Sequence, residues 1–300
     1  MVVTKAENNK VGFVRGGGIQ LVLTLVREHQ QLLEMQSESK QQQQGESDVE
    51  RDNGDEVRGM LKEACLVLRG VCVGDDLRRD FSSAHDSSRE VVAKGGVEAI
   101  TFLARTTLDS IENTPTNNPQ SDSKVDCEGE DSIPLNSDFI GTIELLSASF
   151  LCLKQLASTD ENVHEIVREG GLDMAQRALI IAIQQQLLTL GRSSVALLRN
   201  MAASDRYKDD LAESGVGGQV AELMTMFGED GGMMEHSLAL FAQLALRSPH
   251  NSRILSQEGV LSVSIGAMRK FGERVSLQVL KLLFQLCNFV NLMENRDKGV

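Results

Sequence analysis

Tryptophan is absent from this sequence of 300 residues, tyrosine occurs once, and only four prolines are present. Aromatic residues are enriched in strands and proline interrupts helices. Their scarcity, together with frequent leucine, alanine, glutamine and glutamate, favours helices over a β-sandwich or a β-barrel. Hydrophobic residues make up 41% of the chain, which is enough for a packed core and excludes a wholly disordered protein.

Signals for secretion and for membranes are also missing. The five cysteines are an odd number without a Cys-x-x-Cys pair, which argues against a secreted disulfide scaffold. The first ten residues are polar and lack the apolar core of a signal peptide. Apolar runs such as 178–183 are much shorter than the ~20 residues that span a bilayer. We therefore expect a soluble protein of a reducing compartment, cytoplasmic or also nuclear, without a membrane partner.

No basic stripe is visible along a chain whose formal net charge is −13. Most of this charge lies in two tracts, which carry −4 over 36–58 and −7 over 109–138. Both tracts are poor in apolar residues, so we predict two acidic disordered loops, the first rich in glutamine and the second in proline and serine. A duplex-DNA partner would need clustered lysine and arginine, and none is therefore expected.

One short phrase recurs five times and indicates a repeat architecture. It has a polar start, an apolar turn, then glycine and a branched apolar residue, at 9–19, 87–97, 162–172, 206–216 and 251–260. The final residues of the last three phrases, Leu172, Val216 and Val260, are spaced 44 residues apart, a period within the armadillo/HEAT range. The glycine suits a corner between two helices, where the backbone needs a positive φ.

A helical pattern follows each phrase and supplies the predicted core. Its apolar positions recur at i, i+3 and i+7, which is one face of an α-helix. The first column holds Phe150, Val195, Leu238 and Leu280; the second holds Leu68, Leu153, Leu198, Phe241 and Leu283; the third, restricted to small residues, holds Cys72, Ala157, Ala202, Ala245 and Cys287. We predict units of three helices that stack around a shared core.

The three-helix unit with its glycine corner resembles the armadillo repeat. Two stretches, 68–86 (LRGVCVGDDLRRDFSSAHD) and 197–211 (LLRNMAASDRYKDDL), together with 246–254, are similar to the armadillo repeat-containing protein 6 family. The resemblance implies an all-α, right-handed solenoid of about five repeats that binds other proteins. Because both ends interrupt a unit, we expect residues 1–300 to be a single solenoid cut from a longer one.

A polar column runs beside the core columns and is the first candidate for partner binding. It holds Gly70, Gln155, Asn200, Gln243 and Gln285. In armadillo proteins such as importin α, asparagines of the third helix hold an extended peptide in the concave groove, and Asn200 matches that position. A carboxamide both donates and accepts, as a peptide backbone does. The alternative is an ordinary solvated face, and the absence of tryptophan argues against recognition of basic nuclear-localisation peptides.

A second candidate is a polar cluster in the segment 75–86. It contains Asp75, Asp76, Arg78, His85 and Asp86. The spacing does not fit a calcium loop, and residues between helices commonly serve as connectors and caps. We interpret the cluster as a surface motif and expect no metal and no cofactor.

Motifs for catalysis are not found, so we expect no enzyme. The sequence contains no phosphate-binding loop, no GxSxG and no HExxH. The leading hypothesis is a scaffold that binds an extended or helical partner segment along a concave groove. The alternative is an assembly or chaperone-type adaptor whose acidic loops hold basic proteins.

Overall fold

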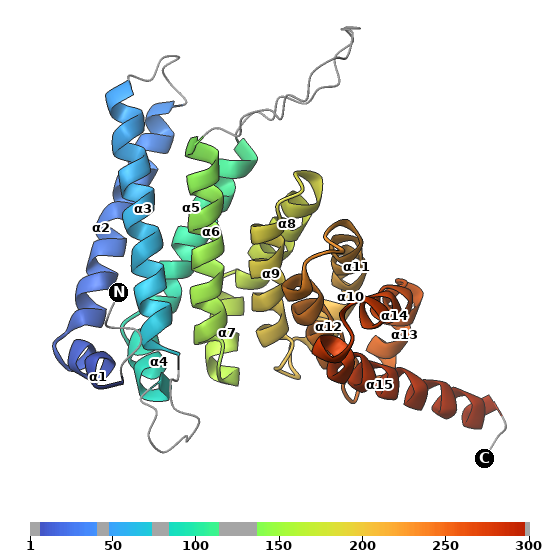
Figure 1. The fold of residues 1–300 in the computed structure, drawn as a ribbon. Helices are drawn as coiled ribbons and strands as arrows, with labels where there is room; N and C mark the ends of the chain where they lie inside the picture. Colours follow the sequence, from blue (N-terminus) through green and yellow to red (C-terminus); the bar gives the residue numbers. More distant parts are fainter. Residues whose placement is uncertain (1–6, 41–47, 74–83, 114–136, 298–300) are drawn as a thin grey trace, which may run out of the picture.

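The chain folds into fifteen helices over the residues that the computed structural model describes, 7–40, 48–73, 84–113 and 137–297. They form five successive groups of three, which confirms the predicted all-α solenoid of five three-helix repeats (Figure 1). The groups are α1 (Glu7–Arg15), α2 (Gly18–Lys40) and α3 (Asp48–Val71); α4 (Ala84–Ala93), α5 (Gly96–Asn113) and α6 (Ser137–Leu156); α7 (Asp160–Arg168), α8 (Gly171–Gln184) and α9 (Leu188–Met201); α10 (Lys208–Glu213), α11 (Val216–Met226) and α12 (Gly231–Ala245); α13 (Pro249–Gln257), α14 (Val260–Phe271) and α15 (Glu273–Asp297).

Each repeat turns from its first to its second helix at a glycine with a positive φ. The five corner glycines, with φ between 74° and 89°, are Gly17, Gly95, Gly170, Gly215 and Gly259. At Gly215 the space around a built Cβ is empty, so the backbone conformation alone requires glycine there. The repeated phrase in the sequence therefore marks the corners, as predicted.

Two rows of helices build the solenoid. The third helices α3, α6, α9, α12 and α15 pack in succession, and the second helices α2, α5, α8, α11 and α14 form the other row (Figure 1). The predicted core columns lie between the rows: Phe150, Val195, Leu238, Leu153, Leu198 and Phe241 are fully buried. Leu280 was wrongly assigned to the core. It is 55% exposed, because no described helix packs on the outer side of α15.

The predicted loop over 36–58 is largely helical, which corrects that assignment. Residues 36–40 belong to α2 and 48–58 belong to α3. Glutamine, glutamate and lysine are good helix formers, and Val57 is buried against the core, so charge did not prevent helix formation. The second predicted loop, 109–138, is likewise helical at both ends, to Asn113 and from Ser137. Residues 41–47 of the first tract and 114–136, which make up most of the second, are outside the described part of the chain.

Helix α6 is the central core helix. The stretch Asp138–Leu156 is long and apolar enough to cross a bilayer, although no single apolar run in the sequence suggested it. It packs against α3, α5 and α9, and its buried side chains include Leu145, Leu146 and Phe150. Contacts with these three helices account for its apolar character.

Candidate partner-binding face

The predicted polar column lies along the third helices, where two of its carboxamides join successive repeats. Gln155 Nε2 donates a hydrogen bond to the carbonyl of Cys72, 3.0 Å away at the end of α3. Asn200 Nδ2 donates to the carbonyl of Lys154, 2.7 Å away in the last turn of α6. The last carbonyls of a helix have no partner within it, so these amides satisfy groups that would otherwise lack one.

The other members of the column behave differently. Gln285 Oε1 accepts a longer bond of 3.4 Å from the backbone N–H of Arg247. The side chain of Gln243 is half-buried and makes no hydrogen bond to any described residue. The column is thus partly a set of joints between repeats, and whether it also binds a partner remains a prediction.

The predicted surface motif falls mostly outside the described residues. Asp75, Asp76 and Arg78 lie in 74–83, which the structure does not describe. His85 and Asp86 begin α4, where Asp86 is exposed in the first turn. Among the described residues, no three histidine, cysteine or acidic side chains are grouped so that they could hold a metal ion.

A row of cations on the third helices escaped the sequence analysis. Arg69 of α3, Lys154 of α6 and Arg199 of α9, here called the basic row, each precede a member of the polar column. All three are half-buried, and none forms an ion pair or a side-chain hydrogen bond within the described part of the chain. Burial, followed by the charges of Arg69 and Arg199, lowers the pKa of the Lys154 ammonium.

His236 of α12 lies beside the basic row. Its pKa is lowered by burial and then by the charges of Arg199 and Lys154, with Glu235 acting in the opposite direction and Arg192 adding to the decrease. Its Nδ1 atom is buried and has no hydrogen-bond partner among the described residues. The field of the row therefore extends over four consecutive third helices, α3 to α12.

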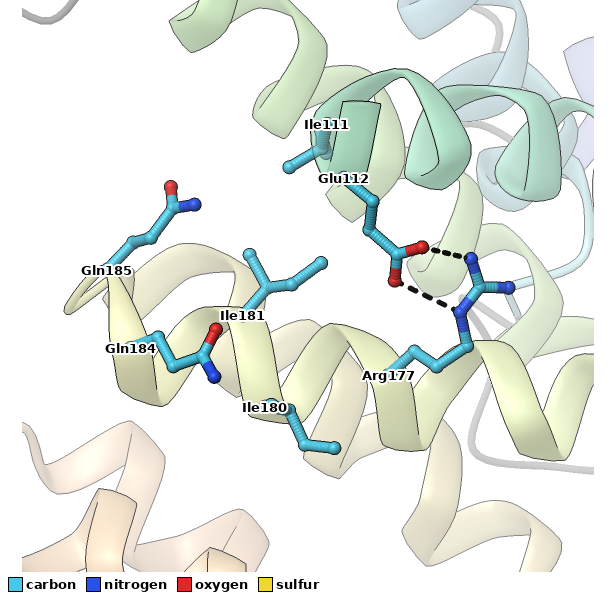
Figure 2. Close-up of a pocket in the computed structure, with 7 residues that line it drawn as sticks. All are labelled: Ile111, Glu112, Arg177, Ile180, Ile181, Gln184 and Gln185. Atoms are coloured by element: carbon cyan, nitrogen blue, oxygen red, sulfur yellow. Dashed lines mark hydrogen bonds and ion pairs between the residues drawn. The ribbon is translucent and has the colours of Figure 1, made fainter. Parts of the chain in front are cut away.

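The described surface also has a shallow depression of about 260 Å³ between α5 and α8, in the row of second helices. Figure 2 shows the residues that line it, among which Arg177 Nε donates to the Glu112 carboxylate over 3.0 Å. Arg177 also pairs with Asp109 at 2.7 Å, and these bonds raise its pKa. Because the Arg177 guanidinium is already paired with carboxylates, we interpret these ion pairs as a link between neighbouring repeats and not as a ligand site.

Comparison with known proteins supports the armadillo assignment. No protein-family model matches the chain. Armadillo repeat-containing protein 6 of Pongo abelii is 26% identical over 202 residues, and the human protein of that name is 26% identical over 203 residues. Both matches cover 65% of this chain and 34% of the relative, so the chain spans about a third of the length of these curated relatives.

Solved structures share the fold at low sequence identity. An engineered protein superposes with a TM-score of 0.61 and 16% identity, covering 96% of this chain and 87% of its own. A designed armadillo repeat protein in complex with the peptide (KR)4 superposes with a TM-score of 0.60 and 11% sequence identity, and the match covers 95% of this chain and 88% of that protein's chain. A structure described under a phosphorylation switch that controls the interaction between cadherin and beta-catenin superposes with a TM-score of 0.53 and 13% sequence identity. The match covers 94% of this chain and 47% of that chain.

The corner glycines, the two helix rows and these neighbours show that the chain has the armadillo-repeat fold. Within that class it is similar to armadillo repeat-containing protein 6, as the stretches 68–86, 197–211 and 246–254 indicated.

Proposed function

We propose that this chain is a scaffold, without catalytic activity of its own, that binds an extended or helical segment of a partner protein along the face of its third helices. The observation that supports this proposal is the alignment of half-buried polar and charged side chains, including the basic row, on adjacent third helices. A partner segment crossing these helices would meet an equivalent position on each repeat. Structural neighbours that hold a peptide or interact with cadherin support the same use of the fold.

A selection from a library of random peptides tests the proposal without knowledge of the partner. Selected peptides are expected to bind the 1–300 chain and to slow amide hydrogen exchange in α6, α9 and α12. Ala239 of α12 is partly exposed and lies one turn after Glu235 and His236, so Ala239→Arg should obstruct the face and weaken this binding. The matched control is Ser262→Arg, at an exposed position of α14 in the other row, which should leave this binding unchanged.

Protection of the second helices alone would contradict the proposal. Binding that is equally strong in Ala239→Arg and in the unmodified chain would also contradict it, because an arginine on α12 cannot leave an occupied face unaffected.

A further inference from the structure

We propose that the partner segment is acidic and that Arg69, Lys154 and Arg199 bind carboxylates placed at every third residue along it. This inference rests on the proposed function and adds the chemistry of the partner. It identifies a surface on the third helices that sequence motifs did not reveal.

The basic row differs from several cations that join neighbouring repeats through ion pairs. Lys62 of α3 reaches Glu144 of α6 at 2.8 Å, Arg177 of α8 reaches Asp109 of α5, and Arg192 of α9 reaches Asp230 at 3.5 Å. The chain has 43 acidic residues against 30 lysines and arginines, so carboxylates are plentiful. Three like charges nevertheless share one face without an anion from the described residues. An anionic ligand would relieve their repulsion.

The hydrogen bonds of the polar column hold the row in register. The Asn200 amide donates to the carbonyl of Lys154. This bond joins the last turn of α9, which carries Arg199, to the last turn of α6, which carries Lys154. The Gln155 amide in turn binds the carbonyl of Cys72, three residues beyond Arg69. The three cations are thus carried on backbone segments whose relative positions are fixed before any ligand binds, which limits the entropy lost on binding.

Helix spacing sets the spacing of the expected carboxylates. Packed helices lie roughly 8–10 Å apart. A segment in the polyproline II conformation rises about 3.1 Å per residue with three residues per turn, so residues i, i+3 and i+6 share one side and lie about 9 Å apart. Acidic residues at these positions would meet Arg69, Lys154 and Arg199 in turn.

The surroundings of the row favour a short acidic peptide over a nucleic acid. Nearer the beginning of α3 than Arg69 lie the exposed carboxylates of Glu56 and Glu63. A phosphate chain that extended beyond the three cations would be repelled by these groups and by the net charge of −13.

Fluorescence anisotropy with defined peptides tests this inference on the 1–300 chain. The probe is a peptide of about nine residues with glutamates at positions 2, 5 and 8, separated by proline and serine. One comparison peptide has the same composition with adjacent glutamates, a second has glutamines in their place, and a single-stranded oligonucleotide of similar length is the third. The spaced acidic peptide should bind most tightly, and its binding should weaken as salt is raised.

Variants assign the binding to the row. Lys154→Gln should weaken binding of the spaced peptide about five-fold, and neutralising all three cations should weaken it about fifty-fold or more. The control neutralises Arg89, Arg253 and Arg269, which are exposed on α4, α13 and α14 and have no ion-pair partner among the described residues. It should change binding by less than about two-fold. A peptide with lysine at position 5 should recover affinity for Lys154→Glu, a result that a misfolded variant could not give.

Several results would overturn the inference. They are binding unaffected by loss of the row, equal affinity for spaced and adjacent glutamates, tighter binding of the oligonucleotide, and no salt dependence in the unmodified chain. If acidic peptides fail while library peptides still protect the third helices, only the inference falls. If no peptide protects those helices, the proposed function falls with it.

Discussion

Carboxamide side chains at the ends of the third helices link neighbouring repeats. Asn200 and Gln155 donate to carbonyls of the preceding third helix, while Asn162 and Asn251, at the starts of the next repeats, donate to the carbonyls of Leu156 and Leu244. Each bond satisfies a carbonyl in or just after the last turn of a third helix, where the helix itself offers no partner. The amides are therefore structural even where they lie on the proposed binding face.

Asn200 and Gln243 should differ in their effect on stability although both occupy the same column. Asn200→Ala removes the bond to Lys154 and should lower the free energy of unfolding by about 1 kcal/mol. Gln243→Ala removes no hydrogen bond to a described residue and should change it by less than about 0.5 kcal/mol. Urea unfolding followed by circular dichroism measures both. Equal losses would show that the bond of Asn200 contributes nothing.

His236 should make stability depend on pH. Its folded-state pKa is lowered by burial, Arg199 and Lys154, with Arg192 adding to this and Glu235 opposing it, so the folded state resists protonation. The contribution of the neutral ring is fully present above the unfolded pKa of about 6.5 and is lost as the pH falls below that value. Between pH 7.5 and pH 5.5 the melting temperature should therefore fall further in the unmodified chain than in His236→Gln. Parallel melting curves would contradict this.

At the scale of helices, the corners decide where each repeat turns. The five short first helices each end two residues before a glycine in the left-handed region, and the second helix begins at the residue after that glycine. Side-chain caps stabilise the N-termini of other helices. At the start of α12, the carboxylate of Asp230 accepts a hydrogen bond of 2.6 Å from the backbone N–H of Met233. These local signals made the boundaries readable in the sequence.

Two glycines provide a matched test of the corner. Gly215→Ala places a Cβ at φ 80° with no steric neighbour and should lower the free energy of unfolding by about 1–2 kcal/mol. Gly266→Ala lies in the exposed interior of α14, also with free space around the Cβ, and should raise it by roughly 0.5–1 kcal/mol. Chemical denaturation distinguishes the two signs. A stabilising Gly215→Ala would mean that the corner does not depend on φ.

At the scale of the whole molecule, each repeat obtains its core from its neighbours. Interior third helices are covered on both sides, whereas α15 presents Leu277, Leu280 and Phe284, which are 59%, 55% and 63% exposed. The same column position is therefore core in α12 and surface in α15. Position in the array changes the energetic weight of an otherwise equivalent residue.

Leu238 and Leu280 test this dependence directly. Leu238→Ala should cost about 2–5 kcal/mol because the side chain is fully buried and leaves a cavity. Leu280→Ala should cost less than about 1 kcal/mol because more than half of the side chain already contacts solvent. Urea midpoints of the two variants measure the difference. Similar costs would indicate that α15 is covered in solution.

The sequence by itself determined the helical class, the five repeats, the corners and most of the core, because these depend on periodicity and on glycine within a few residues. It predicted a loop at 36–58, because composition does not show that a charged segment can pack on the core as a helix. It placed Leu280 in the core, because the sequence does not show whether a neighbouring helix covers that residue. Only the tertiary structure brought Arg69, Lys154 and Arg199 together from positions 85 and 45 residues apart. Stacking converts equal positions in successive repeats into neighbours, so a basic row can form in an acidic chain without any run of basic residues.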